Sequence, residues 1–260
     1  MEWSEDAIVL VLRRHGENDA IVSVLARGQG RYSGLVRGGA GRRAGPVYQP
    51  GNRIAARWRA RLDDQLGALT AELVHGHAAR LMGDADRLSA LVAAAAVADA
   101  ALPDREPHPL CFDGLADLLA RLDAEDAWPA AYVCWERDLL AELGFGLDLE
   151  RCAVTGSREE LRWVSPRSGR AVSAAAGAAY ADRLLRLPPF LLADGVAGAP
   201  PADVLDGLRL TGRFLENHVF AALGRAGAPA ARGRLVDRIA RLATMGGGES
   251  PQRPQNLQDS

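Results

Sequence analysis

One strand-like stretch decides the fold of the N-terminal part of this chain: Arg53-Ile54-Ala55-Ala56-Arg57-Trp58-Arg59-Ala60-Arg61-Leu62. Successive side chains of a β-strand point to opposite faces, so residues two apart share a face. The alternation places Arg53, Arg57, Arg59 and Arg61 on one face and Ile54, Ala56, Trp58, Ala60 and Leu62 on the other. We therefore expect a strand with one face in a core and one basic face.

Other apolar runs of strand length surround this stretch. They cover residues 7–12, 19–26, 32–36 and 66–74, and Gly-rich or Pro-Gly turn signals separate them. Five strands in about 75 residues predict a small closed barrel. The five-stranded Greek-key OB-fold is the commonest barrel of this size that binds oligonucleotides.

From about Asp84 the apolar period becomes helical, and helices are predicted at residues 84–102, 113–122, 129–143, 173–185, 201–223 and 232–242. The predicted fold class is α+β, with an OB-fold barrel at residues 1–80 and a mainly helical domain at 81–245. A small hairpin insertion is expected at 146–171, with a short strand at 162–164. The tail at 246–260 is rich in Gly, Pro, Gln and Ser, which predicts disorder.

Positive charge is concentrated in the barrel. The segment from Ala20 to Leu62 holds nine arginines and no Asp or Glu, whereas the whole chain has a formal net charge of −2. A local positive field suits a polyanion, because each neutralised phosphate releases a counterion. The candidate DNA-binding residues are Arg31, Arg37, Arg42, Arg43, Arg53, Arg57, Arg59, Arg61 and Tyr32.

The aromatic residues of this segment have open roles. Trp58 points to the core face and is expected to be buried, whereas Tyr32 and Tyr48 are candidates either for the core or for stacking on bases. The arginines also have a plainer interpretation, as a solvated strand face. The absence of acids favours the binding surface, since a merely soluble surface mixes both signs.

Composition excludes several functions. All 31 basic residues are arginine, so a phosphate-binding P-loop and a pyridoxal Schiff base, which both need lysine, are excluded. Three cysteines and no signal-peptide pattern predict a cytoplasmic protein with reduced thiols. The longest apolar stretch, Leu88 to Leu102, is shorter than the ~20 residues that span a bilayer, so no membrane association is expected.

The search for catalytic groups finds no constellation. His75-x-His77 offers two metal ligands, which alone rarely form a site, and a solvated or capping role is favoured. The spacing of Cys111, Cys134 and Cys152 fits no zinc motif, and no serine lies in a nucleophile elbow. We expect neither an enzyme nor a metal site.

Several motifs, in their order and spacing, resemble one bacterial family. They are Arg14-His15-Gly16-Glu17-Asn18-Asp19-Ala20-Ile21-Val22, Gly34-Leu35-Val36-Arg37-Gly38, Gln49-Pro50-Gly51, Glu142-Leu143-Gly144-Phe145-Gly146-Leu147-Asp148-Leu149, Cys152-Ala153-Val154-Thr155-Gly156 and Val164-Ser165-Pro166-Arg167-Ser168-Gly169-Arg170. From about Trp3 to about Leu242 the chain resembles the RecO recombination mediators.

The resemblance implies an N-terminal OB-fold, a helical domain and, in some members, zinc held by paired cysteines in the insertion. This chain keeps Cys152 but has Thr155, Ser165 and Ser168 where further thiolates would be sought. The insertion is therefore expected to be a degenerate zinc finger, and no cofactor is expected.

The resemblance also implies a function in DNA repair and recombination. Such proteins bind single- and double-stranded DNA, anneal complementary strands, and act with RecR and the acidic C-terminal tail of the single-strand-binding protein to help load RecA during gap repair. This implies a cytoplasmic, nucleoid-associated protein. For the tail, the low-specificity candidates on the helical domain are Arg121, Arg137, Arg232, Arg234 and Arg238.

Two alternatives remain open at this stage. The first is a basic OB-fold adaptor that binds an acidic protein rather than DNA, which predicts negligible retention on single-stranded DNA. The second is an enzyme whose barrel binds nucleic acid and whose insertion supplies an unrecognised site.

Overall fold

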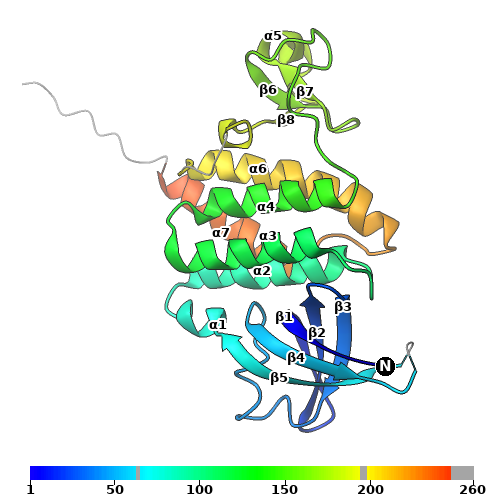
Figure 1. Cartoon of the computed structure of the whole chain (residues 1–260). Coiled ribbons are helices and arrows are strands. Elements are labelled where there is room, and N and C mark those ends of the chain that lie inside the picture. The colour runs from blue at the N-terminus through cyan, green and yellow to red at the C-terminus, as the bar shows by residue number, and fades with distance from the viewer. Residues whose placement is uncertain (63–64, 194–197, 247–260) are drawn as a thin grey trace, which may run out of the picture.

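The fold was analysed in a computed structural model that describes residues 1–62, 65–193 and 198–246 (Figure 1). Its first five strands are β1 (Glu2–His15), β2 (Asp19–Ala26), β3 (Gly30–Val36), β4 (Arg53–Arg59) and β5 (Gly67–His75). They close into a barrel in the order β1-β2-β3-β5-β4, in which β3 and β5 run parallel and the other pairs antiparallel. This arrangement confirms the predicted OB-fold barrel.

The alternation predicted for β4 is confirmed along the strand itself. Ile54, Ala56 and Trp58 are buried, whereas Arg57 and Arg59 are exposed. The expectation that Leu62 faces the core is wrong, since β4 ends at Arg59 and the Leu62 side chain is 58% exposed. The alternating pattern of the sequence therefore continues beyond the strand that it describes.

Strand β1 is buried on both faces in its middle section. Ala7 and Val9 point into the barrel core, whereas Ile8 and Leu10 belong to the core of the helical domain together with Leu25 of β2. A strand covered on both sides needs apolar residues at consecutive positions. This explains why the chain is continuously apolar here and shows that barrel and helices share one packed boundary.

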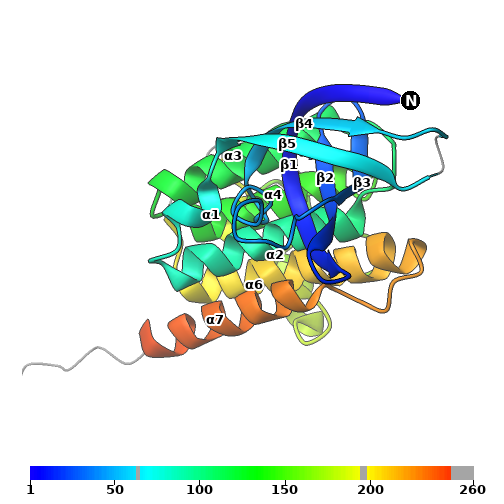
Figure 2. The same ribbon diagram turned by 90° about the horizontal axis from the view of Figure 1, so that it is seen from below.

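The helical domain lies on that boundary. Its helices are α1 (His77–Arg80), α2 (Ala85–Ala101), α3 (Pro109–Ala124), α4 (Trp128–Glu142), α6 (Pro201–Phe214) and α7 (Ala230–Gly246), and a π-helical segment at Leu215–Phe220 extends α6. Helix α2 packs against β1 and β2 of the barrel on one side and against α3 and α7 on the other (Figures 1 and 2). It begins at Asp84, whose carboxylate accepts hydrogen bonds from the backbone amides of Asp86 and Arg87, as an N-cap should.

A small sheet projects from the end of the molecule that is farthest from the barrel (Figure 1). It consists of β6 (Leu161–Val164), β7 (Ala171–Ser173) and β8 (Leu185–Arg186) in the order β7-β6-β8, which confirms the short strand predicted at 162–164. The helix predicted at 173–185 is wrong. The chain forms only α5 (Ala174–Gly177) and a 3₁₀ turn before β8 pairs with β6, so pairing with a distant strand overrides local helical propensity.

The predicted disordered tail falls on residues 247–260, which lie outside the described residues; α7 itself continues to Gly246. In the described part of the chain, no helix is both long and apolar enough to cross a membrane.

Candidate nucleic-acid interface

Three arginines of the arginine-rich segment pair with carboxylates that lie outside it: the candidates Arg53 and Arg57, and Arg27. Arg53 pairs with Asp6 and Arg57 with Glu2, because β4 lies beside β1 in the barrel. Arg27 forms two hydrogen bonds of 2.9 and 2.8 Å to Asp113 of α3, and these bonds lower the pKa of the Asp113 carboxyl. A phosphate would have to displace a carboxylate to bind any of these side chains.

Arg31 connects the barrel to the helical domain. Its side chain is 12% exposed and lies 3.3 Å from the Asp99 carboxylate and 3.0 Å from that of Asp104. Its Nε also donates a 2.9 Å hydrogen bond to the carbonyl of Leu102 at the end of α2. Arg31 is therefore not part of the candidate DNA surface, because its guanidinium already binds the Leu102 carbonyl and the carboxylates of Asp99 and Asp104.

Tyr32 is likewise enclosed. Its ring packs edge-on against Trp3 at 5.3 Å and Trp58 at 4.9 Å between ring centroids, and the residue is 6% exposed. Trp58 is fully buried, which confirms the expectation for that residue, and Tyr48 is buried as well. The geometry assigns Tyr32 to the barrel core, where it cannot stack on a base.

The remaining arginines line open surface. A groove of about 580 Å³ lies between β3, the loop that follows it and the start of β5. Arg37, Arg43 and Arg59 contribute to its lining, together with Leu35, Val36, Ala44, Val47, Tyr48, Leu66, Gly67, Ala68, Leu69, Thr70 and Ala71. The groove thus combines an apolar surface with three guanidinium groups.

A second hollow continues this groove along the barrel. It has a volume of about 530 Å³ and shares Arg59, Leu66 and Ala68 with the first, and its lining also includes Arg61 and Glu2. Arg42 is exposed on the loop after β3, whose base is fixed by Asn52 through hydrogen bonds of 2.9 and 3.2 Å to the carbonyls of Pro46 and Val47. Within the described residues, no carboxylate pairs with Arg37, Arg42, Arg43, Arg59 or Arg61.

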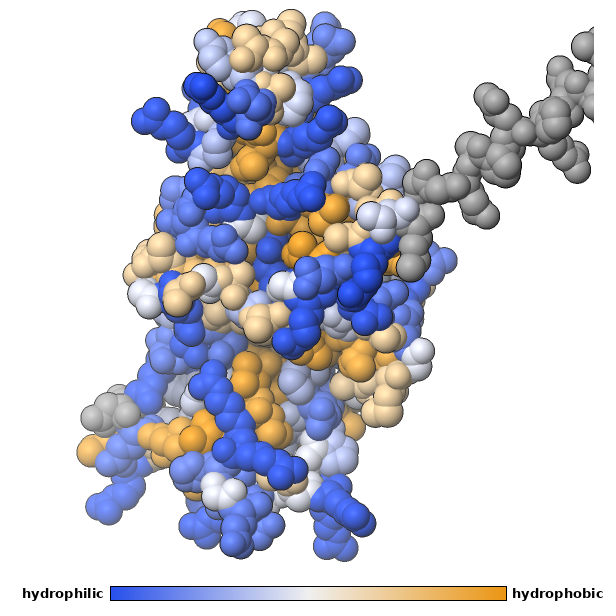
Figure 3. Space-filling view, turned by 180° about the vertical axis from the view of Figure 1, so that it is seen from behind, coloured by the Kyte–Doolittle hydropathy of each residue, from blue (hydrophilic) through white to orange (hydrophobic). Residues whose placement is uncertain are grey.

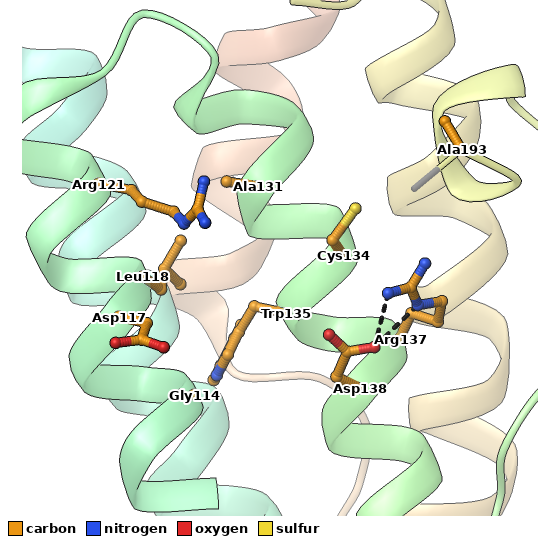
Figure 4. Close-up of a pocket in the computed structure, with 10 residues that line it drawn as sticks. All are labelled: Gly114, Asp117, Leu118, Arg121, Ala131, Cys134, Trp135, Arg137, Asp138 and Ala193. Carbon is orange, nitrogen blue, oxygen red and sulfur yellow. Dashed lines mark hydrogen bonds and ion pairs between the residues drawn. The ribbon is translucent and has the colours of Figure 1, made fainter. Parts of the chain in front are cut away.

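The candidate partner residues of the helical domain occupy three different places. Arg121 and Arg137 line a pocket of about 240 Å³ between α3 and α4, with Leu118, Cys134 and Trp135 beside them (Figure 4). Arg137 pairs with Asp138 at 2.8 Å and Arg121 with Glu125 at 3.0 Å. The recess therefore combines apolar surface with two guanidinium groups and two carboxylates, those of Asp117 and Asp138.

Arg234 and Arg238 line a separate groove of about 470 Å³ between α2 and α7, where Arg238 pairs with Asp86 at 2.6 Å. Arg232, in contrast, is buried. Its guanidinium donates to both oxygens of the fully buried Glu136 at 2.7 and 2.8 Å, and to the carbonyl of Leu208. Arg232 is therefore a core residue that cannot receive a partner protein, and the five candidates do not form one site.

The insertion does not offer a zinc ligand set. Burial raises the pKa of the Cys152 thiol, but hydrogen bonds to its sulfur from Ser173 and Thr155 outweigh burial and lower the pKa to about 6. The sulfur is thus satisfied by backbone amides, and no other cysteine lies in this segment. Hydroxyl groups at Thr155, Ser165 and Ser168 do not replace thiolates as zinc ligands.

One cluster of potential metal ligands was missed by the sequence analysis. His75 and His77 lie beside Asp123, and the three donor atoms are within 4.8 Å of one another. The two histidines were noticed as a pair, but Asp123 is 46 residues from His77, so spacing gave no signal for it.

The far side of the molecule carries apolar surface bordered by strongly hydrophilic side chains, both over the barrel and over the helical domain (Figure 3).

Two family descriptions match the chain: "Recombination protein O N terminal" over residues 1–77 and "Recombination protein O C terminal" over residues 82–225.

Full-length relatives match as well. The chain is 53% identical to the DNA repair protein RecO of Rhodospirillum centenum, over 95% of this chain and 98% of that protein. It is 51% identical to the protein of the same name from Rhodospirillum rubrum, covering 93% and 97% of the two chains, and 52% identical to that of Phenylobacterium zucineum, covering 92% and 98%.

Proposed function

The chain belongs to the RecO family, and from this premise we propose that it acts in DNA repair and recombination by binding DNA through its barrel and annealing complementary strands. The observation that carries the proposal is the groove at β3 and β5, where Arg37, Arg43 and Arg59 surround an apolar lining. Guanidinium groups bind phosphate oxygens in a bidentate manner, and apolar surface accommodates unstacked bases.

Annealing by such a surface needs no catalytic residue, so we propose a protein that is not an enzyme. Two strands repel each other because both are polyanions, and the arginines neutralise part of that charge while counterions are released. Phosphate contacts hold the backbone without occupying base edges, which leaves the bases free to pair. Binding is therefore expected to depend on salt and to show little sequence preference.

A second proposed contact lies on the helical domain. The recess between α3 and α4 fits an acidic peptide with an aromatic end, such as the C-terminal tail of the single-strand-binding protein. Leu118, Cys134 and Trp135 offer apolar surface, and Arg121 and Arg137 offer positive charge (Figure 4). Arg234 and Arg238 on the α2–α7 groove are a second candidate site, in which Arg238 is paired with Asp86 as Arg121 and Arg137 are paired with Glu125 and Asp138.

The basic groove lies on the barrel and the recess lies between α3 and α4, so the two can bind different molecules at once. A protein that holds the strand through the barrel and the tail of its coat protein through the recess would act as a mediator, together with RecR, in loading RecA at gaps. This role would place the protein with the nucleoid in the cytoplasm. The competing function is a basic adaptor that binds an acidic protein instead of DNA, and the five arginines that pair with no carboxylate among the described residues are compatible with it.

One experiment separates these functions. Two complementary oligonucleotides are coated with the cognate single-strand-binding protein, with or without its C-terminal tail, and annealing is followed over a salt series. We expect annealing that falls with salt and depends on the tail. The Arg121→Gln/Arg137→Gln variant should lose the tail dependence, whereas Arg183→Gln/Arg209→Gln, at two exposed and paired arginines outside both grooves, is the matched control. Failure to anneal uncoated strands at low salt would support the adaptor.

A further inference from the structure

We propose that His75, His77 and Asp123 form a binding site for one divalent transition-metal ion, zinc above all, at the junction of the barrel and the helical domain. His75 is the last residue of β5, His77 is the first residue of α1, and Asp123 lies in the last turn of α3. The barrel and the helical domain thus both contribute ligands, and α1 lies at their junction in Figure 1.

The donor atoms already converge. Asp123 Oδ2 lies 3.1 Å from His75 Nε2 and 2.8 Å from His77 Nδ1, and the two imidazole rings are 4.1 Å apart between centroids. Tetrahedral metal bonds of about 2.0–2.2 Å place neighbouring ligand atoms roughly 3.3–3.6 Å apart. The side chains therefore need only small adjustments to coordinate an ion.

A buried oxygen without a partner points to a ligand at this position. The Asp123 side chain is 10% exposed, and its Oδ1 is buried without a hydrogen-bond partner in the described structure. A buried carboxylate oxygen left unpaired is costly, and such atoms in native proteins commonly indicate an ion or water. Arg80 does not supply the missing contact to Oδ1, since its Nε lies 3.7 Å from the other oxygen, Oδ2.

The donor set selects the class of ion. Two imidazole nitrogens and one carboxylate oxygen suit zinc and its first-row neighbours, whereas magnesium and calcium prefer oxygen ligands alone. Three protein ligands leave a further position, and the partial exposure of His75 opens it to water. Each imidazole would bind through the nitrogen that faces Asp123, and the proton on that nitrogen would move to the other ring nitrogen or be released.

The consequence of binding would be mechanical. The first residues of β5, Gly67, Ala68 and Leu69, line the basic groove. His75 is the last residue of the same strand. An ion that joins His75 and His77 to Asp123 would therefore fix the end of β5 to α3. Arg31 makes the comparable connection from β3 to the end of α2. The two connections would hold the barrel against the helical domain at separate points.

The test uses the full chain after treatment with a chelator. Zinc binding is measured by calorimetry, bound zinc by elemental analysis, and cobalt serves as an optical probe of the ligands. We expect one ion per chain, a cobalt spectrum without thiolate bands, and at least a tenfold loss of affinity in Asp123→Asn and in His75→Gln. His15→Gln, an exposed histidine on β1, is the matched control and should bind as the parent does.

A second measurement needs no variant. In the imidazole nitrogen NMR spectrum of the unaltered protein, zinc should shift the signals of two histidines and leave those of His15, His108 and His218 in place. The proposal is overturned by the absence of saturable binding, or by binding that both variants retain. In that case the three side chains only join the two domains by hydrogen bonds. The outcome is independent of DNA annealing, so the proposed function is tested separately.

Discussion

The arginines of the barrel form two groups that differ in what lies opposite each side chain. Arg27, Arg31, Arg53 and Arg57 meet carboxylates from β1, α3 and the end of α2. The second group, Arg37, Arg42, Arg43, Arg59 and Arg61, meets no carboxylate among the described residues, and four of its members line the groove and its continuation. The first group is paired within the protein, and the second is the surface that we propose binds DNA.

This difference shows how an acid-free segment overstates a binding surface. The segment contains no Asp or Glu, but folding brings Glu2, Asp6, Asp99 and Asp113 to its arginines from outside it. An arginine that is already paired gains little from a phosphate, since it must first lose a carboxylate. The following experiments test the division between the two groups.

The largest effect is expected from removing three charges of the groove. Arg37→Gln/Arg43→Gln/Arg59→Gln should weaken binding to a single-stranded oligonucleotide about a hundredfold at ~0.1 M salt, because each lost phosphate contact lowers the salt slope by about 0.7. Fluorescence anisotropy over a salt series measures both quantities. The matched control is Arg27→Gln/Arg53→Gln/Arg57→Gln, and an equal loss in both triple variants would mean that total charge, not the groove, determines binding.

Arg31→Ala should instead reduce stability. The substitution leaves the Asp99 carboxylate, which is 9% exposed, without its buried guanidinium partner. We expect the free energy of unfolding to fall by roughly 2–3 kcal/mol, which is less than the ~3–5 kcal/mol typical of a broken buried pair, because Ser23 still donates to Asp99. Urea denaturation measures the change, and Arg59→Ala, on the open surface, should stay within about 0.5 kcal/mol of the parent.

Single neutralisations should give smaller and graded effects. Replacing Arg37, Arg42, Arg43, Arg59 or Arg61 by Gln should each weaken binding about fivefold at ~0.1 M salt and should not alter sequence preference. Arg57→Gln should give a clearly smaller loss, since Glu2 already pairs with Arg57. A residue whose replacement leaves the salt slope unchanged does not contact the strand.

The smallest effect concerns the exposed pair of Arg27 and Asp113. Hydrogen bonds from Arg27 lower the pKa of Asp113 below its ordinary value of 3.8. The folded state thus favours the carboxylate, so the pair contributes stability above about pH 4 and loses it as pH falls through the lower folded-state pKa. NMR titration of the Asp113 carboxyl should show the depressed midpoint, and Arg27→Gln should return it toward 3.8. An unchanged midpoint in that variant would assign the shift to another group.

The sequence predicted the fold well where local patterns coincide with packing. Alternation in β4 reflects a strand with one buried face, and the apolar period of α2, α3, α4 and α7 reflects helices that pack on one another. The failed helix at 173–185 shows the limit of such patterns. Its residues have helical propensity, but Leu185 and Arg186 are needed as the third strand beside β6.

The candidate site was less accessible to sequence reasoning. Arg232 and Arg234 are two residues apart and look alike in the chain, yet one pairs with the buried Glu136 and the other lines a surface groove. Tyr32 has the composition of a base-stacking residue but lies between Trp3 and Trp58. Neither result is encoded within a few neighbouring positions.

What the sequence by itself determined is therefore the barrel, the helical domain, the concentration of arginines in the barrel and the resemblance to the RecO family. What only the tertiary structure decided is which arginines remain available, which aromatic rings are enclosed, and that Asp123 joins His75 and His77. The physical reason is that periodicity and composition are local properties, whereas charge pairing and ligand geometry depend on residues that folding brings together from distant positions.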